Sequence, residues 1–162
     1  VLPPAPTTPA GQVRKITLEA NENVLAVAPG VTQELWTFGG QVPGPIIRAK
    51  LGDVLEITLV NKGKVGHSID FHAARVDVTK EFEPVKPGDQ KKFSFVATFP
   101  GVFFYHCGAE PMIQHVARGM FGAIIVDPKY SHAWPKADRE YVLVQSEYFK
   151  NPGDVQAMFE KH

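Results

Sequence analysis

The chain has 162 residues, of which 44% are apolar, so it is long enough for one domain with a full core. Its 17 basic and 17 acidic residues give no basic excess, which argues against nucleic acid or an anionic membrane surface as a partner. No apolar run reaches the roughly 18 residues of a membrane span, and the single cysteine cannot form an internal disulfide.

The pattern of turns and alternating residues predicts short β-strands. Residues 1–11 contain four prolines and no periodicity, so we expect an extended arm or linker. Apolar and polar residues then alternate at 55–59 and 92–95. Turn signals recur at 21–23, 29–30, 39–40, 43–44, 52–53, 61–63, 87–88 and 100–101. This spacing predicts an all-β, antiparallel sandwich or barrel with Greek-key connections.

The C-terminal part of the sequence predicts two late strands, at 122–126 and 141–144, and a short capped helix at 151–162. A helix that follows a finished β-domain and stops abruptly is typical of a connection. We therefore expect an arm at 1–11, a β-domain at 12–149 and, at 150–162, the start of a connection to a second domain.

A first cluster of candidate metal ligands surrounds the only cysteine, Cys107, which is followed by His115 and Met120. Thiolate, imidazole and thioether form a soft ligand set, and a blue-copper centre combines two His, one Cys and a weak axial Met. His67 is the expected fourth ligand, because alternation within an extended 66–72 segment directs it toward the core. Each residue alone is compatible with an ordinary core side chain. Together they predict one copper site.

A second cluster faces the other way by the same alternation: His72 and His106, with Asp70 beside them. Two imidazoles are too few for a closed metal site, so a third ligand is needed. The other histidines have no predicted strand to place them: His132 and His162. Because the strand at 102–106 is apolar on both faces, we expect another subunit or a missing domain to supply the third histidine. The alternative is a pair of surface histidines without metal.

The two clusters meet at neighbouring residues, Cys107 and His106, so a single peptide unit would link the two metals. That connection suits electron transfer from the first metal to the second. Asp70 is placed to deliver protons at the second metal. A redox metal beside a proton source is typical of a reductase acting on a small oxidised substrate.

Four segments resemble the first domain of copper-containing nitrite reductases: 40–45, 66–74, 100–107 and 115–120. The resemblance implies a Greek-key cupredoxin domain with a short C-terminal connecting helix. It also implies an exported, periplasmic enzyme of denitrification, its signal peptide already removed, that reduces nitrite to nitric oxide by one electron. The implied partners are nitrite, a cupredoxin or cytochrome c as electron donor, and a second cupredoxin domain or chain within a homotrimer or heteromeric equivalent.

The resemblance also implies a role for each candidate residue. Type 1 copper is expected at His67, Cys107, His115 and Met120, type 2 copper at His72 and His106, and Asp70 is expected to hydrogen-bond and protonate nitrite. Two alternatives stay open. In the first, the chain is a mononuclear type 1 copper electron-transfer protein without catalysis. In the second, it is a fragment of a laccase-like oxidase, although it lacks the paired His-x-His motifs of such oxidases.

Overall fold

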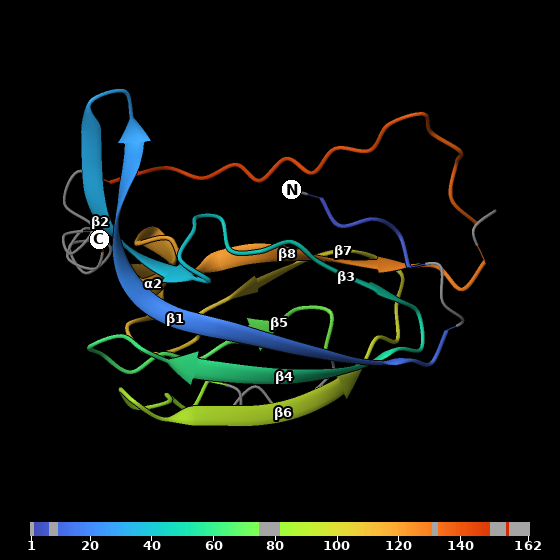
Figure 1. Cartoon of the computed structure of the whole chain (residues 1–162), viewed down its shortest axis with the longest axis horizontal. Helices are drawn as coiled ribbons and strands as arrows, with labels where there is room; N and C mark the ends of the chain where they lie inside the picture. Colours follow the sequence, from blue (N-terminus) through green and yellow to red (C-terminus); the bar gives the residue numbers. More distant parts are fainter. Residues whose placement is uncertain (1, 7–9, 75–81, 131–132, 150–154, 156–162) are drawn as a thin grey trace, which may run out of the picture.

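The computed structural model describes residues 2–6, 10–74, 82–130, 133–149 and 155. In these ranges the chain is almost entirely β-structure, with strands β1 to β8 and a short helix, α2. The strands form two curved four-stranded sheets that pack face to face (Figure 1). The predicted all-β sandwich is therefore confirmed.

The first sheet has the strand order β2-β1-β4-β6. Its strands are β1 (Val13–Ala28), β2 (Val31–Phe38), β4 (Val54–Asn61) and β6 (Gln90–Val96). The first half of β1 pairs with β4 in parallel, and the second half pairs with β2 as an antiparallel hairpin. Figure 1 shows this hairpin rising away from the rest of the sheet.

The predicted turn at 21–23 is wrong, because these residues lie inside β1. The reason is a set of side-chain hydrogen bonds across the hairpin. The Thr37 hydroxyl donates to the backbone oxygen of Asn21 at 3.0 Å, and the Asn23 amide donates to the Thr37 hydroxyl at 2.8 Å. These asparagines therefore stabilise an extended strand pair, although such side chains often favour turns.

The second sheet has the order β3-β8-β7-β5. Its strands are β3 (Ile47–Lys50), β5 (Asp70–Phe71), β7 (Gly101–His106) and β8 (Phe121–Asp127). β7 pairs antiparallel with β5 and β8, whereas β3 pairs with β8 in parallel. Each sheet thus contains one parallel pair, so the sandwich is mixed and not antiparallel throughout as the sequence predicted.

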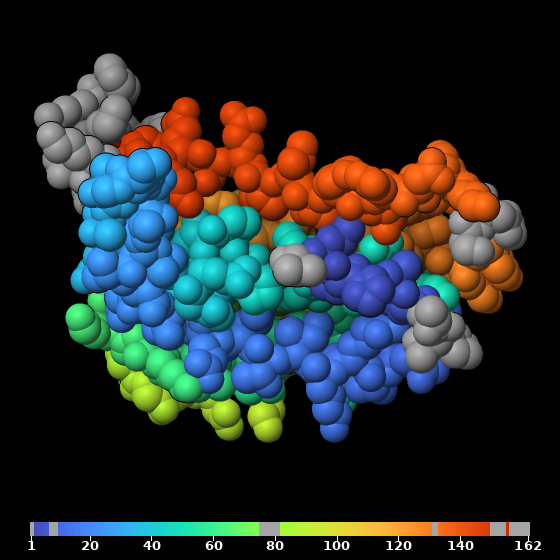
Figure 2. Space-filling model, turned by 45° about the horizontal axis from the view of Figure 1, so that its top comes forward, coloured from blue at the N-terminus to red at the C-terminus, as the bar shows by residue number. Residues whose placement is uncertain are grey.

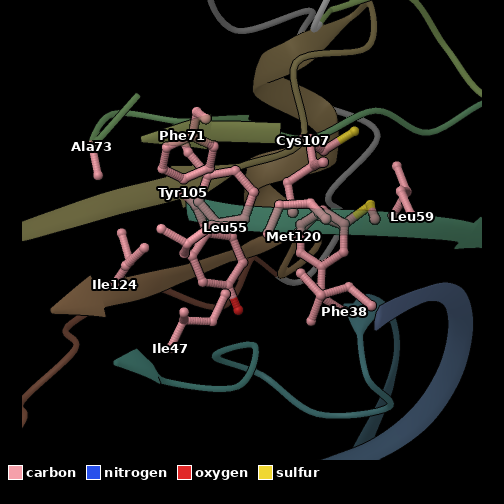
Figure 3. Close-up of a cluster of buried hydrophobic side chains, with 14 of the residues drawn as sticks. Phe38, Ile47, Leu55, Leu59, Phe71, Ala73, Tyr105, Cys107, Met120 and Ile124 are labelled. Atoms are coloured by element: carbon pink, nitrogen blue, oxygen red, sulfur yellow. The ribbon is translucent and has the colours of Figure 1, made fainter. Parts of the chain in front are cut away.

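The core lies between the two sheets and follows the predicted alternation in β4. Leu55, Ile57 and Leu59 are fully buried, while the residues between them are not. Figure 3 shows Leu55 near Tyr105 of the second sheet and Leu59 on the side of Cys107 and Met120, all within one buried cluster. Full burial of a large aliphatic side chain contributes about 1.5–3 kcal/mol, so this cluster fixes how the sheets pack.

The segment at 133–149 is extended and runs along the second sheet without joining it (Figures 1 and 2). It is held by Arg48, whose guanidinium donates to Asp127 at 2.8 and 2.9 Å and to Glu140 at 2.9 and 3.2 Å. The strand predicted at 141–144 is wrong, because these residues have no partner strand among those described, and Leu143 is 93% exposed.

Two further expectations concern the C-terminal helix and membrane spans. The helix predicted at 151–162 lies outside the described residues, apart from residue 155. Among the residues that are described, no helix is both long and apolar enough to cross a membrane.

Candidate metal centres

The end of β7 carries the first donor cluster, which joins three buried side chains from distant parts of the sequence. His67, Cys107 and His115 each offer one donor atom, and these atoms lie within 4.8 Å of one another. Cys107 Sγ lies 3.2 Å from His115 Nδ1, and the Nδ1 atoms of the two histidines lie 3.3 Å apart. The structure thus brings together three of the four residues predicted for the first copper.

Different local structures present these three donors. His67 lies in an isolated bridge to Val85, with backbone hydrogen bonds of 3.1 and 2.7 Å that keep its segment extended. Cys107 follows the last residue of β7, and the backbone N–H of Ser68 donates to its sulfur at 3.3 Å. His115 lies in the helix α2 (Met112–Ala117). Only the orientation of Cys107 follows from strand alternation alone.

Met120, the fourth predicted residue, is fully buried directly before β8. Its carbonyl accepts a hydrogen bond from the Cys107 N–H at 3.0 Å, and its own N–H donates to the His115 carbonyl at 3.1 Å. Figure 3 shows the sulfur atoms of Met120 and Cys107 pointing to the same edge of the core cluster. Backbone hydrogen bonds therefore join the Met120 backbone to both Cys107 and His115.

Burial controls the protonation of the first cluster. Desolvation lowers the pKa of His115 to about 4, helped by His67 and Arg118, and desolvation also lowers the pKa of His67. Both imidazoles are therefore neutral near pH 7 and have a lone pair available for a metal. Burial raises the pKa of the Cys107 thiol, so a metal must displace its proton on binding.

The second donor cluster lies on the opposite side of the β7 end and contains Asp70, His72 and His106. The Nε2 atoms of the two histidines are 3.1 Å apart. Asp70 Oδ2 lies 3.4 Å from His72 Nε2 and 3.5 Å from His106 Nε2. The structure thus brings together all three residues predicted for the second site.

The pairing of β5 with β7 builds this second cluster. Asp70 stands opposite His106 in the ladder, and the backbone N–H of His72 donates to the Phe104 carbonyl at 3.0 Å. Asp70 and His106 are buried, whereas the side chain of His72 is 51% exposed. This site is therefore open on one side.

The tautomer of His106 follows from its contact with the next residue. Its Nδ1 lies 2.9 Å from the Cys107 carbonyl oxygen, which can only accept, so Nδ1 carries the proton. Its Nε2 then presents a lone pair toward Asp70 and His72. The two sites thus share one peptide unit, with Sγ of Cys107 on one side and Nε2 of His106 on the other.

The donor sets fit copper. One thiolate, two imidazole nitrogens and a thioether form the soft set that blue-copper sites use, and the second cluster offers the nitrogen and oxygen donors of a harder copper site. In the first cluster the buried Nδ1 of His115 lies beside both the sulfur of Cys107 and the Nδ1 of His67. Such neutral donor atoms, brought together without a positive charge among them, are suited to a cation.

Two features of the first site were missed by reasoning from the sequence. One is the helix that carries His115, and the other is Trp36 of β2. The Trp36 ring contacts His115 edge-on at 4.7 Å and His67 at 5.4 Å between ring centroids. The Arg118 guanidinium lies over the same ring at 4.7 Å. A single tryptophan in an alternating strand was the only available signal.

Comparison with protein families matches residues 19–131 to the multicopper oxidase model. The copper-containing nitrite reductase of Neisseria meningitidis serogroup B is 37% identical over 140 residues. Among solved structures, the copper nitrite reductase from Nitrosomonas europaea is 55% identical with a TM-score of 0.89. The Cu-containing nitrite reductase from Thermus scotoductus is 39% identical with a TM-score of 0.68.

These matches cover most of this chain but only part of the other proteins. The Neisseria alignment takes in 83% of this chain and 35% of the relative. The Nitrosomonas alignment takes in 93% of this chain and 54% of the other, and the Thermus alignment 74% and 28%. The chain therefore spans 28% to 54% of the length of these three proteins.

Proposed function

Because this chain belongs to the multicopper oxidase family and has a cupredoxin fold, we propose that it works as the first domain of a copper-containing nitrite reductase. In this proposal 1–11 form an arm, 12–149 form the cupredoxin domain, and 150–162 begin the connection to a second domain. The activity is the one-electron reduction of nitrite to nitric oxide, in the periplasm, as part of denitrification.

The observation that carries the proposal is the position of two donor clusters on consecutive residues. Copper bound at both clusters supplies one-electron redox chemistry. The chain itself supplies a short covalent connection, because Cys107 and His106 share a peptide unit and the His106 Nδ1–H donates to the Cys107 carbonyl. A simple metal-storage or structural site has no need of such a connection.

We assign type 1 copper to His67, Cys107, His115 and Met120, and type 2 copper to His72 and His106. The exposure of His72 supports a third histidine from a second cupredoxin domain or chain, within a homotrimer or a heteromeric equivalent. The electron donor is a small cupredoxin or a cytochrome c that delivers to the buried first site.

Asp70 is the acid–base residue in this proposal. Reduction of nitrite to nitric oxide and water consumes one electron and two protons, so the site needs a proton donor. Asp70 Oδ2 lies within 3.5 Å of both Nε2 atoms, which is close enough to hydrogen-bond a small anion held there. Its role is to orient nitrite and to pass on, in turn, the two protons that the departing nitrite oxygen takes up, with solvent at the open side of the site as their source.

A second candidate function is favoured by the openness of the second cluster. Within the described residues only two imidazoles and one carboxylate converge there, and one imidazole is half exposed. The chain is then a mononuclear type 1 electron-transfer protein whose His72 and His106 bind no metal.

Copper stoichiometry with electron paramagnetic resonance distinguishes the two candidates. The protein is loaded with copper alone and again with a chain that supplies the second cupredoxin domain. We expect a type 1 signal in both preparations, and a type 2 signal with nitrite turnover in the second. A type 1 signal without any type 2 signal in every preparation would remove the reductase proposal and leave the electron carrier.

A further inference from the structure

Within the part of the chain that the structure describes, the second ring nitrogen of His67 has no hydrogen-bond partner. Its Nδ1 faces the other donors of the first cluster, while its Nε2 is buried on the far side of the ring. Buried ring nitrogens are nearly always paired, so this one requires an explanation. A carboxylate lies nearby, because Oε1 of Glu22 is 3.8 Å from Nε2.

Glu22 is held at this position by the β1–β2 hairpin. It lies opposite Trp36, the residue whose ring contacts both histidines of the first site. The residues on either side of it, Asn21 and Asn23, are tied to Thr37 by side-chain hydrogen bonds. The Glu22 side chain is only 10% exposed. A carboxylate that is so nearly buried needs partners.

The loop between β4 and His67 supplies one partner and leaves space for the other. The backbone N–H of Lys64 donates to both oxygens of Glu22, at 2.9 and 3.2 Å. At Gly63 an added Cβ would lie 2.9 Å from Glu22 Oε1 and 3.1 Å from His67 Nε2. The absence of a side chain at Gly63 therefore lets the carboxylate and the imidazole approach each other.

A bridging water does not fit this gap. Two hydrogen bonds of about 2.8 Å through one water at a tetrahedral angle would separate the heavy atoms by about 4.6 Å. The observed 3.8 Å is shorter than that, and a movement of under about 1 Å makes a direct hydrogen bond. A small rotation of the Glu22 carboxylate or the His67 ring is sufficient.

We propose that Glu22 is the positioning residue of the first metal site: its carboxylate accepts the Nε2–H of His67 and so directs the Nδ1 lone pair toward Cys107 and His115. The inference rests on the proposed function only in taking copper as the metal. A carboxylate that accepts the second N–H of a ligating histidine fixes its tautomer and raises its basicity. Its negative charge also favours the more positive, oxidised metal.

The experiment measures the reduction potential and the copper affinity of the loaded chain. Glu22→Gln keeps the shape and removes the charge, and Glu22→Leu removes both the charge and the acceptor. Glu34→Gln is the matched control, because Glu34 is an exposed carboxylate on the same hairpin. We expect the potential to rise in both Glu22 variants and copper affinity to fall about 10- to 100-fold in Glu22→Leu, with no change in the control.

A third variant tests the space between the two groups. Gly63→Ala retains the Glu22 carboxylate but places a methyl group between Oε1 and Nε2, so we expect it to raise the potential in the same direction. If Glu22→Gln and Glu22→Leu both keep the potential and affinity of Glu34→Gln, the inference is overturned. If the unaltered chain bound no copper, the proposed function would be overturned instead. Failure of the inference and failure of the proposed function therefore give different results.

Discussion

Tyr105 directly precedes His106 and Cys107, and its side chain is closely packed. The contribution of this packing to the free energy of unfolding can be measured. The Tyr105 hydroxyl donates to the Pro45 carbonyl at 2.7 Å. At Gly44 an added Cβ would lie 2.5 Å from this hydroxyl, 3.2 Å from Phe38 Cβ and 3.3 Å from the Phe121 carbonyl. Because Gly44 does not have a positive φ, an alanine there meets a steric obstacle and no backbone strain.

The structure sets the size of each effect. Tyr105→Phe removes a buried hydrogen bond, which costs about 1–2 kcal/mol in the free energy of unfolding. Gly44→Ala forces the hydroxyl aside, and overpacking of this kind costs about 1–3 kcal/mol. In the double variant the hydroxyl, which is the nearest obstacle to the new methyl group, is gone. We expect the double variant to be more stable than the sum of the single changes by about 1 kcal/mol.

Urea unfolding of the metal-free chain, monitored by circular dichroism, gives the free energy of unfolding of the unaltered chain, the two single variants and the double variant. The m-values must agree among the variants for the free energies to be compared. Additivity within about 0.5 kcal/mol would refute the reasoning, because it would mean that the methyl group and the hydroxyl do not compete for the same space.

Three other changes test the two sites and the frame around them. Cys107→Ser is expected to abolish the visible charge-transfer absorption of the copper-loaded chain, and survival of that absorption would exclude thiolate ligation. Asp70→Asn in an assembly with the second domain is expected to retain both coppers but lose about 100-fold or more of turnover; unchanged turnover removes Asp70 from the mechanism. Burial opposes the charge of Asp53, but Arg14 and two backbone N–H groups outweigh it and hold its pKa below the usual range. The lowered pKa of Asp53 therefore stabilises the fold fully at pH values above the carboxyl pKa of the unfolded chain, and this stabilisation is lost as the pH falls through the lower pKa of the folded chain. We expect the free energy of unfolding of Asp53→Asn to change less with pH in this acidic range, which unfolding measurements at several pH values check.

Strand alternation made part of the site readable from the sequence. In β7 the side chains of Tyr105 and His106 point to opposite faces, and the pairing with β8 keeps that alternation to the end of the strand. The parity that placed Cys107 with the core therefore follows from period-two geometry. The same rule identified the buried residues of β4.

Other elements leave too little signal for such reasoning. The helix α2 has six residues, Pro111 as its N-cap and no side-chain capping bond, so neither length nor caps mark it. The parallel pairing of β1 with β4 and of β3 with β8 cannot be read from alternation, which carries no strand direction. Residues 141–144, Tyr-Val-Leu-Val, are apolar residue types that favour strands, but pairing depends on a neighbour that the sequence does not reveal.

Glu22 shows a different limit. It lies within an Asn-Glu-Asn stretch whose composition favours a turn, and its importance depends on His67, which is 45 positions away in the sequence. Only the three-dimensional arrangement of the hairpin and the loop at Gly63 brings the two side chains together. Long-range polar contacts of this kind have no local pattern.

In the proposed function, the different burial of the two clusters gives them different roles. At the first, Cys107, His67 and His115 are closed to solvent, so substrate cannot reach a metal there and only electrons can pass. At the second, the exposed side of His72 leaves room for a small ligand, as catalytic metal sites require. Phe104, whose ring centroid lies 5.8 Å from that of His72, and Val102, two residues before it on β7, are also exposed. A domain or subunit that covered them would exclude water around the opening. In this proposal catalysis at the second cluster therefore depends on a partner, whereas electron storage at the buried first cluster does not.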